Sequence, residues 1–60
     1  MIEAYFLLTD QSVVKGWVPE GRDMIRMGPN LVPFFYDFSV KENGHDVPVY
    51  KESMDHPTTL

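Results

Sequence analysis

The chain contains no cysteine among its 60 residues. Disulfides, cysteine-ligated zinc and iron–sulfur clusters are therefore excluded as sources of stability. A chain of this length buries only about 60% of the surface that its unfolded form exposes. Domains so small usually need a disulfide, a metal or a partner chain. We therefore expect tight packing or association with another chain to supply the stability that cross-links would provide elsewhere.

Basic residues are scarce, with five Lys and Arg against nine Asp and Glu, which gives a net charge of −4. Phosphate binding needs a basic footprint, so this composition argues against a nucleic-acid-binding protein. On the first hairpin, Lys15 beside Trp17 is the only place where a basic residue accompanies an aromatic that could stack on a base. An acidic surface is suited to a basic groove on a partner protein. The same charges also serve ordinary solubility.

Long apolar runs are absent, since no segment approaches the ~20 apolar residues of a membrane span. The opening "MIEAYFLLTD" has neither a basic residue nor a small-residue cleavage site, so it does not have the pattern of a signal peptide. Together with the lack of cysteine, these features predict a cytoplasmic protein with no membrane association.

Catalytic and cofactor motifs are also missing. No Ser lies in a G-x-S-x-G pattern, and no P-loop or dinucleotide-binding fingerprint occurs. His45 and His56 each neighbour an aspartate, but a zinc site needs three or four ligands held rigidly. The sequence therefore predicts a protein that is not an enzyme and that carries no metal and no cofactor.

What the chain does contain is a series of short strand-like segments. Residues 2–9 alternate with apolar side chains at every even position, which favours a strand, although eight residues leave a helix open. The turn-forming "DQS" and the strand-like residues 13–18 follow, with Gly16 marking a bulge or a close approach of another group. Residues 24–27 fit a strand or one turn of helix. Gly28 to Leu31 has the pattern of a β-turn.

A second hairpin is predicted more sharply. Regular pairing should begin only after Pro33, giving a strand over residues 34–40. Asn43-Gly44 is the dipeptide of a two-residue type I′ turn. Such a turn fixes the register by placing Val40 opposite Val47. The same register sets Phe38 opposite Val49 and Lys41 opposite Asp46. Because proline cannot donate to a ladder, Pro48 predicts that the returning strand lies at the edge of the sheet.

These segments predict a mainly β fold, with a small antiparallel sheet of four or five strands that is curled or open and barrel-like. We expect residues 1–50 to form a single small β-domain and residues 51–60 to form a loose, flexible C-terminal tail.

The aromatic run from Phe34 to Phe38 sits within this predicted hairpin. Simple alternation places Phe34, Tyr36 and Phe38 on one core face together with Val40. Phe35 and Tyr50 fall on the other face, outside this core. On the first hairpin, the side chains that likewise fall outside a single core face are Tyr5, Leu7 and Trp17. A chain of this size has too few residues to cover both faces, so either loops wrap the sheet or an apolar patch stays exposed.

The predicted function is a non-enzymatic protein-binding module, a small acidic regulator or inhibitor of another protein of the kind that phages and mobile elements encode. The alternative is a structural component that assembles into a homo-oligomer through edge strands and aromatic faces. The acidic members of the predicted site would set the orientation of the partner. The predicted protein-binding residues are Tyr5, Trp17, Phe35, Asp37, Tyr50 and Glu52.

Overall fold

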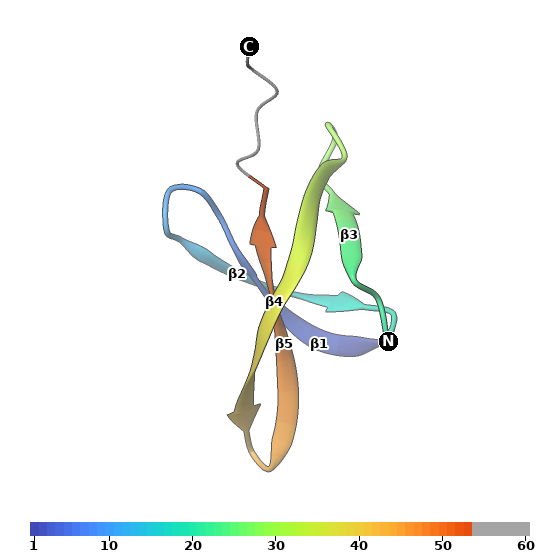
Figure 1. The fold of residues 1–60 in the computed structure, drawn as a ribbon, viewed down its shortest axis with the longest axis vertical. Helices are drawn as coiled ribbons and strands as arrows, with labels where there is room; N and C mark the ends of the chain where they lie inside the picture. The colour runs from blue at the N-terminus through green and yellow to red at the C-terminus, as the bar shows by residue number, and fades with distance from the viewer. Residues whose placement is uncertain (54–60) are drawn as a thin grey trace.

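The computed structural model describes residues 1–53, which form one five-stranded sheet with the strand order β2-β1-β5-β4-β3. The strands are β1 (Ile2–Leu7), β2 (Val13–Val18), β3 (Met24–Met27), β4 (Val32–Glu42) and β5 (His45–Glu52). The sheet curls into a half-barrel in which the β1–β2 hairpin crosses the long β4–β5 hairpin (Figure 1). The predicted mainly β class is confirmed. One pairing, between β1 and β5, is parallel rather than antiparallel.

The β1–β2 hairpin turns where the sequence predicts. Leu8 N donates to Ser12 O and Gln11 N donates to Leu8 O, each at 2.9 Å. Gln11 adopts a φ of 73°, the left-handed conformation that commonly ends a three-residue hairpin loop. The hydroxyl and the backbone N–H of Ser12 both donate to Oδ1 of Asp10, at 2.5 Å and 2.9 Å, and these two bonds lower the pKa of Asp10 because they stabilise its charged form. The ambiguity over residues 2–9 is resolved in favour of a strand.

Gly16 marks a close approach rather than a bulge, because the β1–β2 register runs without interruption from Ile2–Val18 to Leu7–Val13. A Cβ atom at Gly16 would lie 3.0 Å from Cε2 of Phe6. The missing side chain therefore makes room for the Phe6 ring beside the β2 backbone.

The β3–β4 connection is the predicted β-turn, in which Leu31 N donates to Gly28 O at 3.0 Å. Residues 24–27 form a strand. The expectation that pairing starts only after Pro33 is wrong, since Val32 already pairs with Met27 and Pro33 with Arg26. Tyr36 N donates to Asp23 O, so alternation makes Arg26–Pro33 a pair without backbone hydrogen bonds. A proline there costs this ladder no donor.

The Asn43-Gly44 turn sets the register that the sequence predicts, with Val40 opposite Val47, Phe38 opposite Val49 and Lys41 opposite Asp46. Both turn residues have positive φ, 50° and 79°, as a type I′ turn requires. Beyond Phe38 the register shifts by one residue. Asp37 is the extra residue of a β-bulge. An uninterrupted register would pair Asp37 with Tyr50, but Tyr50 pairs with Tyr36.

The bulge overturns the prediction of a single core face along β4. A bulge adds one residue to one strand, so the alternation of side chains changes phase across it. Phe34 is buried as predicted, but Tyr36 and Phe38 are 46% and 45% exposed. Tyr36 shares the face of Phe34 and Tyr50, whereas Phe38 shares the opposite face with Val49.

The prediction that β5 is an edge strand is also wrong, because β5 lies between β1 and β4. The physical reason is that β1 joins β5 only from Val49 onward, through the pairs Tyr5–Val49, Phe6–Tyr50 and Leu7–Lys51. The segment that contains Pro48 is therefore paired on one side only. β5 continues to Glu52, beyond the domain end expected at residue 50. The remainder of the predicted tail, residues 54–60 with His56, lies outside the described residues.

The core lies on the concave face of the sheet. Phe6 of β1 packs against Phe34 of β4 in an edge-to-face arrangement at 5.5 Å and stacks on Tyr50 of β5 at 5.7 Å. Ala4 and Val18 complete the buried cluster. Side chains from strands that are not neighbours meet here because the sheet curls around them. The described residues contain no helix with the length and hydrophobicity that crossing a membrane requires.

Candidate functional site: an uncovered apolar face and an acidic cleft

The outer face is the side of the sheet opposite the core. The β1–β2 register places Trp17 beside Glu3, Lys15 beside Tyr5 and Val13 beside Leu7 on this face. The row that contains Leu7 continues through Lys51 to Phe35 and Met24, so it crosses all five strands. A second row runs from Lys15 and Tyr5 through Val49 to Phe38. No second layer of the described chain covers these rows.

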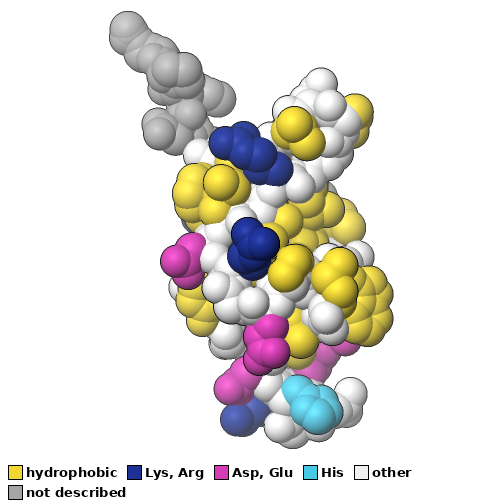
Figure 2. Space-filling view, turned by 90° about the vertical axis from the view of Figure 1, so that its right-hand side faces the viewer, with side chains coloured by type: hydrophobic (Ala, Val, Ile, Leu, Met, Phe, Trp, Pro, Cys, Tyr) yellow, Lys and Arg dark blue, Asp and Glu magenta, His cyan; other side chains and the backbone are white. Residues whose placement is uncertain are grey.

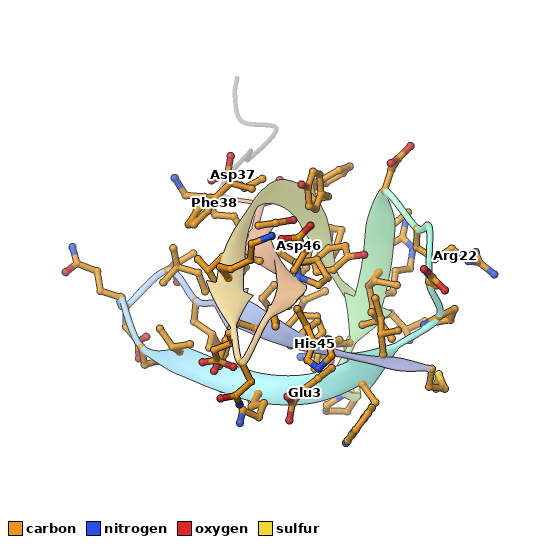
Figure 3. The ribbon with its side chains drawn as sticks, turned by 90° about the horizontal axis from the view of Figure 1, so that it is seen from below. Glu3, Arg22, Asp37, Phe38, His45 and Asp46 are labelled. Carbon is orange, nitrogen blue, oxygen red and sulfur yellow. The ribbon has the colours of Figure 1, made fainter. Side chains whose placement is uncertain are left out.

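The middle of the outer face is a shallow apolar groove of about 260 Å³, here called the outer patch. Its members come from β1, β2, β4 and β5, and they are Tyr5, Leu7, Val13, Phe38, Val40 and Val49. Val49 forms the floor with only 7% of its surface exposed, while Phe38 and Val13 are 45% and 58% exposed. The Asp37 bulge brings Phe38 to this face. Phe38 lies on the side of the β4–β5 ribbon away from Arg22 (Figure 3).

Beside the outer patch the two hairpins diverge and leave an open cleft of about 600 Å³, here called the acidic cleft. It lies between the end of the β1–β2 hairpin that carries Trp17 and the β4–β5 turn. Trp17 is 63% exposed. Four carboxylates line the cleft, those of Glu3, Glu20, Glu42 and Asp46. On the side of the molecule that Figure 2 shows, most of the visible acidic side chains lie toward the β4–β5 turn, and most of the visible Lys and Arg side chains lie above them.

Two lysines lie near these carboxylates and partly neutralise them. Lys15 Nζ is 3.4 Å from Glu3 Oε2, and Lys41 Nζ is 3.2 Å from Asp46 Oδ1. Both pairs are largely exposed, so water and salt screen them strongly. The Lys15 ammonium also lies 5.6 Å from the centroid of the Tyr5 ring. The Glu3 contact raises the pKa of Lys15 because it stabilises the charged ammonium.

The acidic cleft and the outer patch are linked through one side-chain hydrogen bond. Tyr5 O–H donates to Oε2 of Glu42 and so joins β1 to the far end of β4 across the intervening strand. This bond to Glu42, followed by burial and the charge of Glu42, raises the pKa of the Tyr5 phenol. The tyrosine ring thereby forms the boundary between the apolar groove and the carboxylates.

The structure brings three of the six predicted site residues to the outer face. Tyr5, Trp17 and Phe35 all lie there, and Phe35 is 48% exposed beside Lys51 and Met24. Asp37 is the bulged residue next to Phe38 (Figure 3).

The other two predicted site residues have structural roles. The sequence predicts Tyr50 on the uncovered face, but it is only 2% exposed and lies on the core side. Its hydroxyl donates to Arg22 O at 2.7 Å. The bulge explains the difference, because it moves Tyr50 to the core side opposite Tyr36. Glu52 Oε1 accepts a bond from Thr9 N at 3.1 Å and fastens the end of β5 to the β1–β2 loop.

The sequence did not identify Val13, Phe38, Val40 and Val49 as members of the outer patch. Strict alternation through Asp37 predicts that Phe38 and Val40 lie in the core, and the bulge breaks that alternation. The signal that could have indicated the bulge is Asp37, a charged residue within a run of aromatics. A residue of this kind suits the unpaired position of a bulge.

Among residues 1–53, no group of three or more His, Asp or Glu side chains is arranged to hold a metal ion. The acidic cleft has carboxylates on its walls but no such cluster. The carboxylates of the acidic cleft attract cationic groups.

The chain was compared with protein-family models, with curated proteins and with solved structures, and none of them matches it.

Proposed function

We propose that the protein is a non-enzymatic binding module that docks on another protein through the outer patch, with the acidic cleft receiving basic side chains of that partner. In this role it acts as a small regulator or inhibitor of the partner. The observation that carries the proposal is the apolar groove of six side chains drawn from four strands and left open on one side of a single-layer sheet.

Contiguous exposed apolar surface on a small protein commonly marks a protein contact. Interfaces of this kind combine an apolar, aromatic-rich centre with a polar rim. The outer patch supplies the centre, and Trp17 at 63% exposure supplies an aromatic of the type enriched among energetically dominant interface residues.

Charge selects the kind of partner and its orientation. The four carboxylates line the cleft beside Trp17 and the β4–β5 turn, while Lys51 and Arg26 lie on the outer face away from that turn. A partner with an apolar ridge flanked on one side by Lys or Arg therefore fits in one direction only. Electrostatic complementarity of this kind raises association rates and weakens with added salt.

The β4 strand offers a matched pair of variants for the test. Tyr36 and Phe38 are aromatic, equally exposed at 46% and 45%, and two positions apart, but they lie on opposite faces. The immobilised wild-type, Phe38→Ser and Tyr36→Ser proteins are incubated with an extract of the organism that encodes the chain. Each retained protein is then purified and titrated calorimetrically against all three forms.

The proposal predicts a partner that binds the wild type and Tyr36→Ser alike and binds Phe38→Ser at least about tenfold more weakly. The affinity should also fall as salt is raised. Equal binding to all three forms, or no protein retained by the wild type, would overturn the proposal. Far-ultraviolet circular dichroism verifies that both variants keep the sheet.

A further inference from the structure

The free edge of β2 exposes backbone hydrogen-bonding groups that the function proposed above does not use. β2 lies at the end of the strand order and pairs only with β1, over all six of its residues. Its exposed side chains include Val13, Val14 and Trp17 at 58%, 44% and 63%. A regular, apolar edge strand can add a strand from another chain unless charges, proline, a bulge or shortness prevents it.

The hairpin geometry identifies which backbone groups are free. Leu8 N donates to Ser12 O, which makes Leu8–Ser12 a hydrogen-bonded pair. Pairs alternate along an antiparallel ladder, so Val14, Gly16 and Val18 direct their N–H and C=O groups to β1. Val13, Lys15 and Trp17 direct theirs outward, away from the sheet. The edge therefore presents three donors and three acceptors at every second residue.

The usual protections are missing from this edge. β2 contains no proline and no register shift. Its single charge, Lys15, is held over β1, because Nζ lies 3.4 Å from Glu3 Oε2 and 5.6 Å from the Tyr5 ring centroid. At the opposite edge, β3 has only four residues, which offer two outward positions, Met24 and Arg26. Short edge strands resist strand addition, so β2 is the better template.

We propose that two copies of this chain pair antiparallel through their β2 edges, with Gly16 of each copy at the two-fold axis. The resulting sheet has ten strands. Lys15 and Trp17 of one copy lie opposite Trp17 and Lys15 of the other, and the two such pairs exchange four backbone hydrogen bonds. Val14 lies opposite Val18 of the second copy on the inner face.

Charge and side-chain size select this register from the alternatives. Only Val13, Lys15 and Trp17 direct backbone N–H and C=O groups outward. The possible registers of the second β2 strand against the first therefore differ by steps of two residues. Centring the pair on Lys15 would set two ammonium groups directly opposite each other, which is destabilising. Centring it on Gly16 keeps the two lysines apart and sets each Lys15 opposite an uncharged Trp17. Centring it on Trp17 would leave a single pair of outward residues within β2, Trp17 with Trp17, because Lys15 would then face Pro19, which lies beyond β2 and has no N–H.

A second copy is the favoured occupant because the edge is complementary to itself. An acidic chain with net charge −4 would ordinarily resist self-association. The β2 edge is the exception, since β2 itself carries no acidic residue and its one charge, Lys15, is paired with Glu3. A two-fold interface of this kind is closed, so it yields a dimer rather than a fibre.

The first test is the mass in solution, measured by sedimentation equilibrium across a wide range of protein concentration. The wild type should approach twice the 6.9 kDa mass of one chain. Lys15→Pro removes one outward donor from each copy and leaves the β1 ladder intact, so dimerisation should weaken at least about thirtyfold through the loss of two backbone bonds. Arg26→Pro makes the same change at the β3 edge and should leave the dimer unchanged.

Two measurements on the unmodified protein guard against a variant that fails to fold. Amide hydrogen exchange at Lys15 and Trp17 should slow as concentration rises, while exchange at Val14 and Gly16 should be slow throughout. Isotope-filtered spectra of mixed labelled and unlabelled protein should show a contact between the Gly16 Hα atoms of the two copies. A wild-type monomer at every concentration, fast exchange at Lys15 that ignores concentration, or a Val14–Gly16 contact between copies in place of Gly16–Gly16 would overturn the proposal.

Discussion

The two faces of this sheet are built from the same kinds of side chain, yet one is closed and the other open. On the inner face Phe6 and Tyr50 are each 2% exposed, whereas on the outer face Trp17 and Phe38 are 63% and 45% exposed. Curling explains the difference, because it brings side chains from separate strands together on the concave side and spreads them on the convex side. A single-layer sheet of this size can therefore close one core by itself, and the second face needs a partner.

The β4 strand contains both situations within five residues. Phe34 lies in the core, Phe38 lies on the outer patch, and the Asp37 bulge separates them. The bulge thereby divides one aromatic run between the stability of the domain and its exposed surface.

The largest expected contrast comes from removing one phenylalanine from each face. Phe6→Ala deletes the ring that contacts both Phe34 and Tyr50 and should cost about 3–5 kcal/mol of unfolding free energy. A domain of this size generates roughly 3–5 kcal/mol in all, so this variant should be largely unfolded. Phe38→Ala should cost about 1 kcal/mol or less, because the ring is already half exposed.

Urea denaturation followed by circular dichroism measures both values. Similar losses for Phe6→Ala and Phe38→Ala would mean that the outer face contributes to folding as much as the core does, and the contrast between the faces would fail.

A smaller contrast separates the two tyrosine hydroxyls. Tyr50 donates to Arg22 O from within the core, so Tyr50→Phe leaves that carbonyl without its partner and should cost about 1–2 kcal/mol. Tyr5 donates to Glu42 on the outer face, where water can replace the hydroxyl, so Tyr5→Phe should destabilise the protein less. The same urea titrations rank the two variants, and the reverse order would contradict the assignment of Tyr50 to the core.

The smallest effect should appear on raising the pH. Burial raises the pKa of Tyr50, because the phenolate is less well solvated in the core than in water. The unfolded phenol titrates near pH 10. The stability linked to Tyr50 is therefore fully present below about pH 10 and is lost as the pH rises through the higher folded value. Tyr5 contributes a change of the same sign.

Thermal unfolding recorded between about pH 9 and about pH 11 measures this decline. Tyr50→Phe should flatten it relative to the wild type. If the variant loses stability with pH as steeply as the wild type, the alkaline decline does not come from the core tyrosine.

Local chemistry made much of this fold predictable. The Asn43-Gly44 turn predicted three cross-strand pairs correctly, and the alternation of residues 2–9 predicted which side of β1 enters the core. Both signals act over a few residues, where backbone sterics and side-chain periodicity dominate.

The prediction that β5 is an edge strand failed because it depends on a contact between distant segments. No short sequence motif indicates the parallel pairing of β1 with β5. Pro48 alone predicts an edge strand, whereas β5 is internal in the structure. The Asp37 bulge changes the phase of the side-chain alternation along β4, and it decided the positions of Phe38 and Tyr50. Of the side chains on the outer face, the sequence predicts Tyr5, Leu7, Trp17 and Phe35 and misses Val13, Phe38, Val40 and Val49.

The parallel pairing of β1 with β5 also determines the order of events as the chain acquires its structure. Tyr5 meets Val49, a partner 44 positions later, while every other strand pair joins segments that are close along the chain. The three hairpins can form early, but the Phe6 ring finds Tyr50 only after a long loop has closed, and such closure slows folding. During synthesis the first hairpin must wait with its core side uncovered until residue 51 has left the ribosome, and in that interval it is exposed to chaperones and to premature association.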